Sequence, residues 1–139
     1  MRIVKRTAIL AVALCLAVGA GTATASTDRA KLTIAPIGND RYSLVASADY
    51  GASYTNGVDI AVRLWGDDEW SDDLLYSVPG TIYQGTWDMH FERQFTVSGS
   101  TLNEDWGADE IYADARLYDH KTGKLLLTLK TNLLYGSWS

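Results

Sequence analysis

The amino-acid sequence predicts an all-β protein, a single-domain antiparallel β-sandwich of seven to eight strands. Apolar and polar residues alternate along several stretches, which places one side of each strand on a core and the other toward water. Turn-forming residues recur about every 8–15 positions. After the first 25 residues, no stretch shows apolar side chains at the helical spacing. A small β-barrel is the alternative that the same pattern allows.

The predicted strands follow one another with short connections. Alternation covers residues 58–65, 89–97, 111–118 and 125–130, and shorter strands are predicted at 31–35, 42–48, 74–78 and 133–138. Residues 81–84 form either a strand of their own or a bend that leads into the strand at 89–97. In the first case the loops at 67–73 and 104–110 lie at opposite ends of the fold, and in the second case they share one end.

Turn chemistry separates these strands. Gly38-Asn39-Asp40 divides the first two strands, and Pro79-Gly80 interrupts the middle of the chain. Residues 119–123 close a hairpin in which Gly123 is free to adopt a positive φ. Ser98-Gly99-Ser100 is predicted to form a turn.

The first 25 residues have the character of a cleavable export signal. Three basic residues within the first six precede an uninterrupted apolar run at residues 8–18, and Ala23-Thr24-Ala25 supplies the small residues that a signal peptidase recognises. The apolar run is short for a membrane span. We therefore expect cleavage before Ser26, secretion of one domain formed by residues 26–139, and no membrane span in the mature form.

The composition after this leader excludes several classes of function. The single cysteine, Cys15, lies within the leader, so the mature chain has no thiol for catalysis, metal ligation or a disulfide. Removing the three basic residues of the leader leaves 9 basic residues against 17 acidic ones, a net charge of −8. This charge disfavours a nucleic-acid partner.

The acidic residues concentrate in two segments. Residues 67–73 hold five carboxylates, and residues 104–110 hold four. The segments resemble each other at an offset of 36 positions, because Trp70 and Trp106, Asp73 and Asp109, and a later tyrosine in each stand at matching places. We interpret them as one local arrangement used twice, an acidic loop that leads into a strand.

Carboxylates this close together raise one another's pKa and destabilise a fold unless a cation neutralises them. Ca²⁺ suits such a place because it takes about six to eight oxygen ligands, often from several aspartates. If the two loops share one end, the sequence predicts a calcium site and no other cofactor. The expected ligands are Asp67, Asp68, Asp72, Asp73, Glu104, Asp105, Asp109 and Glu110. The alternative is a solvated acidic surface that keeps the protein soluble.

Signals for catalysis are weak. His90 and His120 are the only imidazoles, and the sequence contains neither an HExxH nor a GxSxG motif. We assign no catalytic residue and favour a protein that is not an enzyme. The alternative is a small secreted hydrolase with a carboxylate-based or metal-assisted site, recognisable by a pocket that contains His90 and two carboxylates.

The first functional hypothesis is therefore a secreted binding module that engages an extracellular protein or carbohydrate through its acidic loops. Trp70 and Trp106 are the predicted partner-binding residues, whereas Trp87 and Tyr112 are expected to pack within the fold. One version of this hypothesis is an inhibitor of a basic extracellular enzyme, because an acidic loop is steered toward a cationic active site. A structural component of the cell envelope or spore surface is a further alternative.

Overall fold

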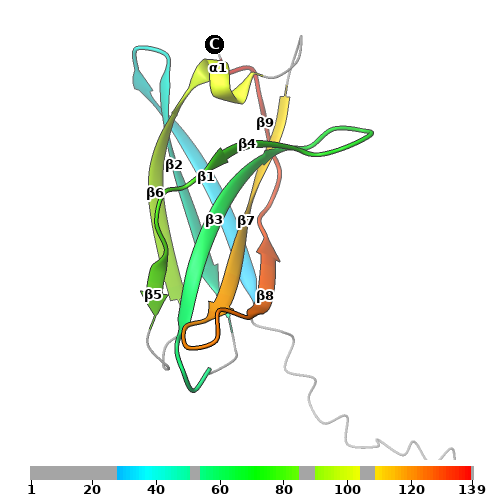
Figure 1. The fold of residues 1–139 in the computed structure, drawn as a ribbon. Coiled ribbons are helices and arrows are strands. Elements are labelled where there is room, and N and C mark those ends of the chain that lie inside the picture. Colours follow the sequence, from blue (N-terminus) through cyan, green and yellow to red (C-terminus); the bar gives the residue numbers. More distant parts are fainter. Residues whose placement is uncertain (1–27, 51–53, 85–89, 104–108, 139) are drawn as a thin grey trace, which may run out of the picture.

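The structure is a computed structural model that describes residues 28–50, 54–84, 90–103 and 109–138, with only the backbone at 82–84. Trp87, Glu104, Asp105, Trp106 and the predicted leader lie outside the described residues. Nine strands and one helical turn are present in the described ranges (Figure 1). They are β1 (Arg29–Gly38), β2 (Arg41–Asp49), β3 (Val58–Gly66), β4 (Asp73–Ser77), β5 (Ile82–Gln84), β6 (His90–Ser98), α1 (Gly99–Leu102), β7 (Asp109–Asp119), β8 (Leu125–Lys130) and β9 (Leu134–Gly136).

The strands form two antiparallel sheets that face each other, which confirms the predicted β-sandwich. One sheet has the order β1-β2-β6, and the other has the order β4-β3-β7-β8, with β5 also paired to β3 and β9 to β7. Every stretch predicted to be a strand has a counterpart, and β5 is the segment that the sequence left open. The described strands do not close into a barrel.

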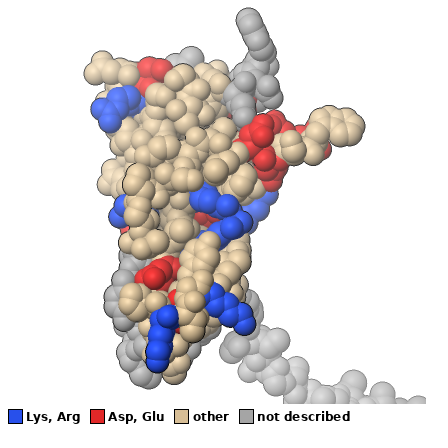
Figure 2. Space-filling view, in the orientation of Figure 1, with Lys and Arg blue, Asp and Glu red and all other residues tan. Residues whose placement is uncertain are grey.

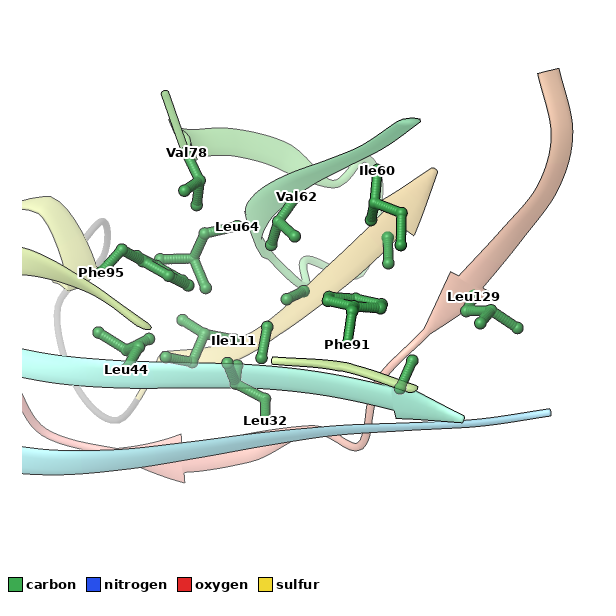
Figure 3. Close-up of a cluster of buried hydrophobic side chains, with 14 of the residues drawn as sticks. Leu32, Leu44, Ile60, Val62, Leu64, Val78, Phe91, Phe95, Ile111 and Leu129 are labelled. Atoms are coloured by element: carbon green, nitrogen blue, oxygen red, sulfur yellow. The ribbon is translucent and has the colours of Figure 1, made fainter. Parts of the chain in front are cut away.

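The core lies between the two sheets, where the alternating side chains of facing strands meet (Figure 3). In β3, Val58, Ile60, Val62 and Leu64 are buried while the residues between them are partly exposed, as the alternation predicts. From the opposite sheet, Phe91 of β6 is fully enclosed. Burial of one such side chain contributes about 1.5–3 kcal/mol to stability, so the inner faces supply the main driving force for folding.

The middle of the chain resolves the question about residues 81–84. β4 pairs with the end of β3 at Arg63–Gly66, and β5 pairs with its beginning at Val58–Ile60, both antiparallel to β3. The chain therefore runs along one edge of β3 in a single direction, with an interruption at Pro79-Gly80 where Gly80 has φ +79°. β5 is a strand, but the chain does not reverse before it, so residues 67–73 and the start of β7 lie at the same end.

Two asparagine side chains bind backbone groups at the edge of the sandwich. The N–H of Leu32 in β1 donates to Asn132 Oδ1 at 2.9 Å, and Asn132 Nδ2 donates back to the Leu32 carbonyl at 3.3 Å. Asn103 holds the C-terminal segment in the same reciprocal way, donating to the Trp138 carbonyl at 2.8 Å and accepting from the Trp138 N–H at 2.9 Å. The first pair of contacts joins the open edge of β1 to Asn132, and the second holds the C-terminal segment against the residue that follows α1.

The turn predicted at residues 98–100 is the start of α1, a helix of one turn. The Ser98 hydroxyl caps it by accepting a hydrogen bond from the Thr101 N–H at 3.3 Å. One turn is too short to produce an apolar stripe, which is why the sequence shows no helical pattern here. Among the described residues, no helix has the length and apolar character that crossing a membrane requires.

Candidate functional site

The first acidic segment and the start of β7 lie side by side. The N–H of Asp67 donates to the Glu110 carbonyl at 2.8 Å, and Gly66 lies opposite both Asp73 of β4 and Ile111 of β7. We call this region, formed by residues 67–74, 109–112 and 134–136, the acidic end. Figure 1 shows the loop between β3 and β4 projecting from the body there, and Figure 2 shows acidic side chains at the base of this loop.

Both ends of the projecting loop are tied to the sheet. Tyr112 donates its hydroxyl hydrogen to Asp72 Oδ2 at 2.6 Å. Lys130 Nζ lies 3.7 Å from the centroid of the Tyr112 ring and 3.9 Å from Asp67 Oδ1. The loop therefore leaves the sheet at a fixed point and returns to it at another.

This network shifts two pKa values in opposite directions. The hydrogen bond from Tyr112, with Lys130 nearby, holds the pKa of Asp72 below its ordinary value. Burial, followed by the hydrogen bond to the Asp72 carboxylate, raises the pKa of Tyr112 well above its ordinary value. At neutral pH the pair is a phenol that donates to a carboxylate, which is the arrangement that holds the loop.

The predicted calcium ligands have different surroundings. Asp67 and Asp72 already contact Lys130 and Tyr112, Asp73 and Glu110 are exposed, and Asp109 is buried. Asp68 is partly exposed and has a contact of its own. Within the described ranges, no three carboxylate or imidazole side chains gather closely enough to hold a metal ion. The calcium site, which also involves Glu104 and Asp105, stays a prediction of the sequence.

Large apolar side chains are exposed at the same end. Trp70 in the projecting loop is 94% exposed, Leu74 at the start of β4 is 49% exposed, and Tyr135 of β9 is 65% exposed. An exposed tryptophan is a common energetic centre of protein interfaces. The role of Trp70 in partner binding stays a prediction, and Trp106 lies outside the described residues.

The register places several of these side chains on the outer face of the six-stranded sheet. Leu74 lies opposite Trp65, and Trp65 lies opposite Tyr112, while Tyr135 lies opposite Glu110. Directly opposed residues project from the same face of a sheet. The outer face therefore presents a row of apolar and aromatic side chains next to an exposed carboxylate.

The basic side chains of this face are already engaged. Arg63 Nε donates to Asp114 Oδ1 at 3.0 Å, and its guanidinium lies 4.6 Å from the Trp65 ring centroid. Arg116 Nε lies 3.8 Å from Asp114 Oδ2, and Lys130 contacts Tyr112 as described above. In Figure 2 basic side chains lie below the acidic group, toward the middle of the sheet. Lys130 offsets part of the charge at Asp67, and among the described residues no basic side chain pairs with Glu69 or Asp73, which keep their negative charge.

The histidines lie at the opposite end. His90 Nδ1 lies 2.6 Å from Asp49 Oδ1, and His120 Nδ1 lies 2.8 Å from Asp59 Oδ1. All four residues stand where β2 and β7 end and where β3 and β6 begin. Among the described residues, neither imidazole lies at the carboxylates of the acidic segments, and the carboxylate that His90 contacts is that of Asp49.

The similarity between the two acidic segments does not extend to the tyrosines that follow. Tyr76 faces the core and stacks on Phe95 with ring centroids 5.9 Å apart, whereas Tyr112 projects from the outer face. An irregularity in the pairing of β3 with β4 next to Trp65 alters the alternation in β4. Tyr112 is buried, as predicted, but its role in holding Asp72 was not foreseen. Its place on the polar side of the β7 alternation indicates that its side chain points to the outer face of the sheet.

Comparisons with known proteins add little about function. No protein-family model and no curated protein matches the sequence. Among solved structures, the chain is similar to a Bordetella pertussis protein described as ApaA, with a TM-score of 0.42, 9% identity and coverage of 80% of this chain and 91% of the other. A β-glucosidase from Kluyveromyces marxianus matches with a TM-score of 0.38, 10% identity and coverage of 81% of this chain and 15% of the other.

Proposed function

We propose that this chain is an exported, non-enzymatic binding module that recognises another protein through its acidic end. The observation that carries the proposal is the exposure of Trp70 on a loop whose two ends are tied to the sheet. A solvent-exposed tryptophan buries a large area when a partner covers it. A loop that is already ordered loses little conformational entropy when it binds.

The other end of the molecule supports this choice of surface by contrast. Among the described residues, Leu125 is the large apolar side chain that is strongly exposed near the β7–β8 hairpin, at 45%. The acidic end exposes three such side chains, Trp70, Leu74 and Tyr135, and carboxylates adjoin them. Apolar anchors surrounded by charged groups are the composition of a protein-binding surface.

The test is capture of a partner from the extracellular medium of the producing organism with the immobilised mature protein. We expect Trp70→Ser to abolish capture, while Leu125→Ser, which removes an exposed apolar side chain at the other end, retains it. Capture that is the same for both variants contradicts the proposal. A partner that is destroyed by glycosidases and not by proteases also contradicts it, because the partner is then a carbohydrate. A parallel capture in the presence of a chelator shows whether Ca²⁺ contributes.

A further inference from the structure

Resting on the proposed function, we propose that the partner is a basic enzyme with a cleft, and that residues 69–71 enter this cleft with Trp70 foremost. The chain then acts as an inhibitor that occupies the place of an anionic substrate. The inference depends on three properties of the projecting loop: its shape, its apolar tip and its charge.

The shape of the loop selects a concave partner. Residues 69–71 are exposed, and the contacts of Asp67 with Glu110 and of Asp72 with Tyr112 hold the loop at its base. Figure 1 shows that the loop extends away from both sheets. A projecting tip is covered on several sides only by a surface that surrounds it, so a cleft buries more of Trp70 than a flat surface does.

The apolar and aromatic side chains provide the contact area. Trp70 is at the tip, and Leu74 and Tyr135 lie on the sheet behind it with exposed fractions of 49% and 65%. Insertion of Trp70 into a cleft therefore brings the rim of the partner against Leu74 and Tyr135. The central apolar anchor and the surrounding contacts that exclude water are the arrangement that gives high affinity.

The charge of the loop selects the sign of the partner. Glu69, Asp73 and Glu110 are exposed around the apolar residues. Of the nearest basic side chains, Lys130 offsets Asp67 at the base of the loop and Arg63 pairs with Asp114, so no described basic side chain pairs with these three carboxylates. A complementary cleft is thus lined by lysine and arginine, and such clefts bind anionic polymers. Occupation of the cleft by this loop excludes that polymer.

The experiment uses the protein captured by the immobilised chain and adds poly-L-aspartate, an anionic polymer without aromatic groups, as the probe. We expect poly-L-aspartate to release the partner in competition with the chain, and we expect association to slow at least 10-fold between 50 mM and 500 mM NaCl. Glu69→Lys should weaken binding about 10-fold or more. Glu92→Lys, an equal change of charge at an exposed site on β6, should change it less than about twofold.

The outcomes separate the two proposals. If no partner is captured, or if capture does not depend on Trp70, the binding function itself is wrong. If a Trp70-dependent partner is captured but poly-L-aspartate does not release it, the binding function stands and the basic cleft is refuted. Equal effects of Glu69→Lys and Glu92→Lys also refute the basic cleft, because charge at the tip then does not matter.

Discussion

The two ends of this sandwich treat carboxylates in opposite ways. At the histidine end, Asp49 and Asp59 each contact an imidazole, and Asp119 accepts a hydrogen bond from Asn56 at 3.0 Å. That hydrogen bond is the first cause of the lowered pKa of Asp119. At the acidic end, Tyr112 and Lys130 hold the loop at its base, and the exposed Glu69 stands next to Trp70 at its tip.

Under the proposed function, this difference separates carboxylates that bind within the chain from carboxylates that are available to a partner. Partners within the chain contact the carboxylates at the histidine end: Asp49 faces His90 across β2 and β6, and Asp119 accepts hydrogen bonds from the N–H groups of Lys121 and Thr122 in the β7–β8 turn. The acidic end uses two of its carboxylates to order a loop and leaves others, such as Glu69, toward solvent. Ordered, exposed and charged groups next to apolar side chains are suited to a partner and contribute little to the stability of the free protein.

The largest expected effect is outside both regions, at Gly99, where α1 packs against Asp40 and the C-terminal segment. A Cβ at Gly99 would overlap Asp40 Oδ1 and the backbone carbonyl of Trp138. We expect Gly99→Ala to reduce the free energy of unfolding by about 3 kcal/mol, because the backbone carbonyl cannot move without displacing the C-terminal segment. Urea denaturation measures the change. A loss of less than about 1 kcal/mol, the cost expected for Gly123→Ala from its φ of +69° alone, contradicts this account of the packing.

Calcium would make the two ends alike by neutralising the exposed carboxylates. The prediction from the sequence is that millimolar CaCl₂ raises the melting temperature more than NaCl of equal ionic strength. At a concentration of 100 Kd the added stability is about 2.7 kcal/mol. We expect Asp73→Asn to reduce this shift, and Asp28→Asn, which is remote from both acidic segments, to leave it unchanged. Identical melting curves in the two salts rule out the calcium site.

Removing the hydroxyl of Tyr112 tests what holds the projecting loop, because it removes the hydrogen bond to Asp72 without changing the charge of the loop. We expect Tyr112→Phe to cost about 1 kcal/mol, a value reduced by the exposure of Asp72, and to raise the pKa of Asp72 toward its ordinary value. The lowered pKa stabilises the folded state above the ordinary pKa, and this contribution is lost as the pH falls through the folded-state value. The free energy of unfolding of Tyr112→Phe therefore falls less on acidification than that of the unmodified protein. Carboxyl NMR titration measures the pKa, and an unchanged value contradicts the role of Tyr112.

The histidine end gives the smallest expected effect. The side chains of His90 and Asp49 are both more than half exposed, so water and salt screen their attraction. We expect His90→Asn to cost less than about 1 kcal/mol and to leave partner binding unchanged. Thermal denaturation and the capture assay measure the two quantities. Loss of capture in this variant would place partner binding at the histidine end and contradict the proposed function.

Much of the fold could be predicted because alternation is a local property. The pattern in β3 correctly identifies Val58, Ile60, Val62 and Leu64 as core residues, since successive side chains of a strand point to opposite faces. The position of the acidic segments was harder to predict. It depends on whether the chain reverses at Pro79-Gly80, and a Pro-Gly dipeptide is compatible with a reversal and with the interruption observed between β4 and β5.

The candidate site could be predicted only in part, because its central contacts join distant segments. Trp70 stands out in the sequence as a tryptophan among carboxylates, a pattern that predicts an exposed position, and the side chain is exposed. The hydrogen bond from Tyr112 to Asp72 and the position of Lys130 above the tyrosine ring depend on the register of β7 with β3 and β8. No local pattern specifies that register, so the groups that hold the loop became visible only in the structure.

Asn132 affects how the molecule behaves among copies of itself. The open edge of a strand is a template for a strand from another chain, and growth from such edges leads to fibrils. At Leu32 of β1, one side-chain amide occupies both the N–H and the carbonyl that an incoming strand would use. Farther along the same edge, Pro36 has no N–H to offer. The chain is thereby protected from polymerising along β1, although Trp70, Leu74 and Tyr135 expose apolar surface elsewhere.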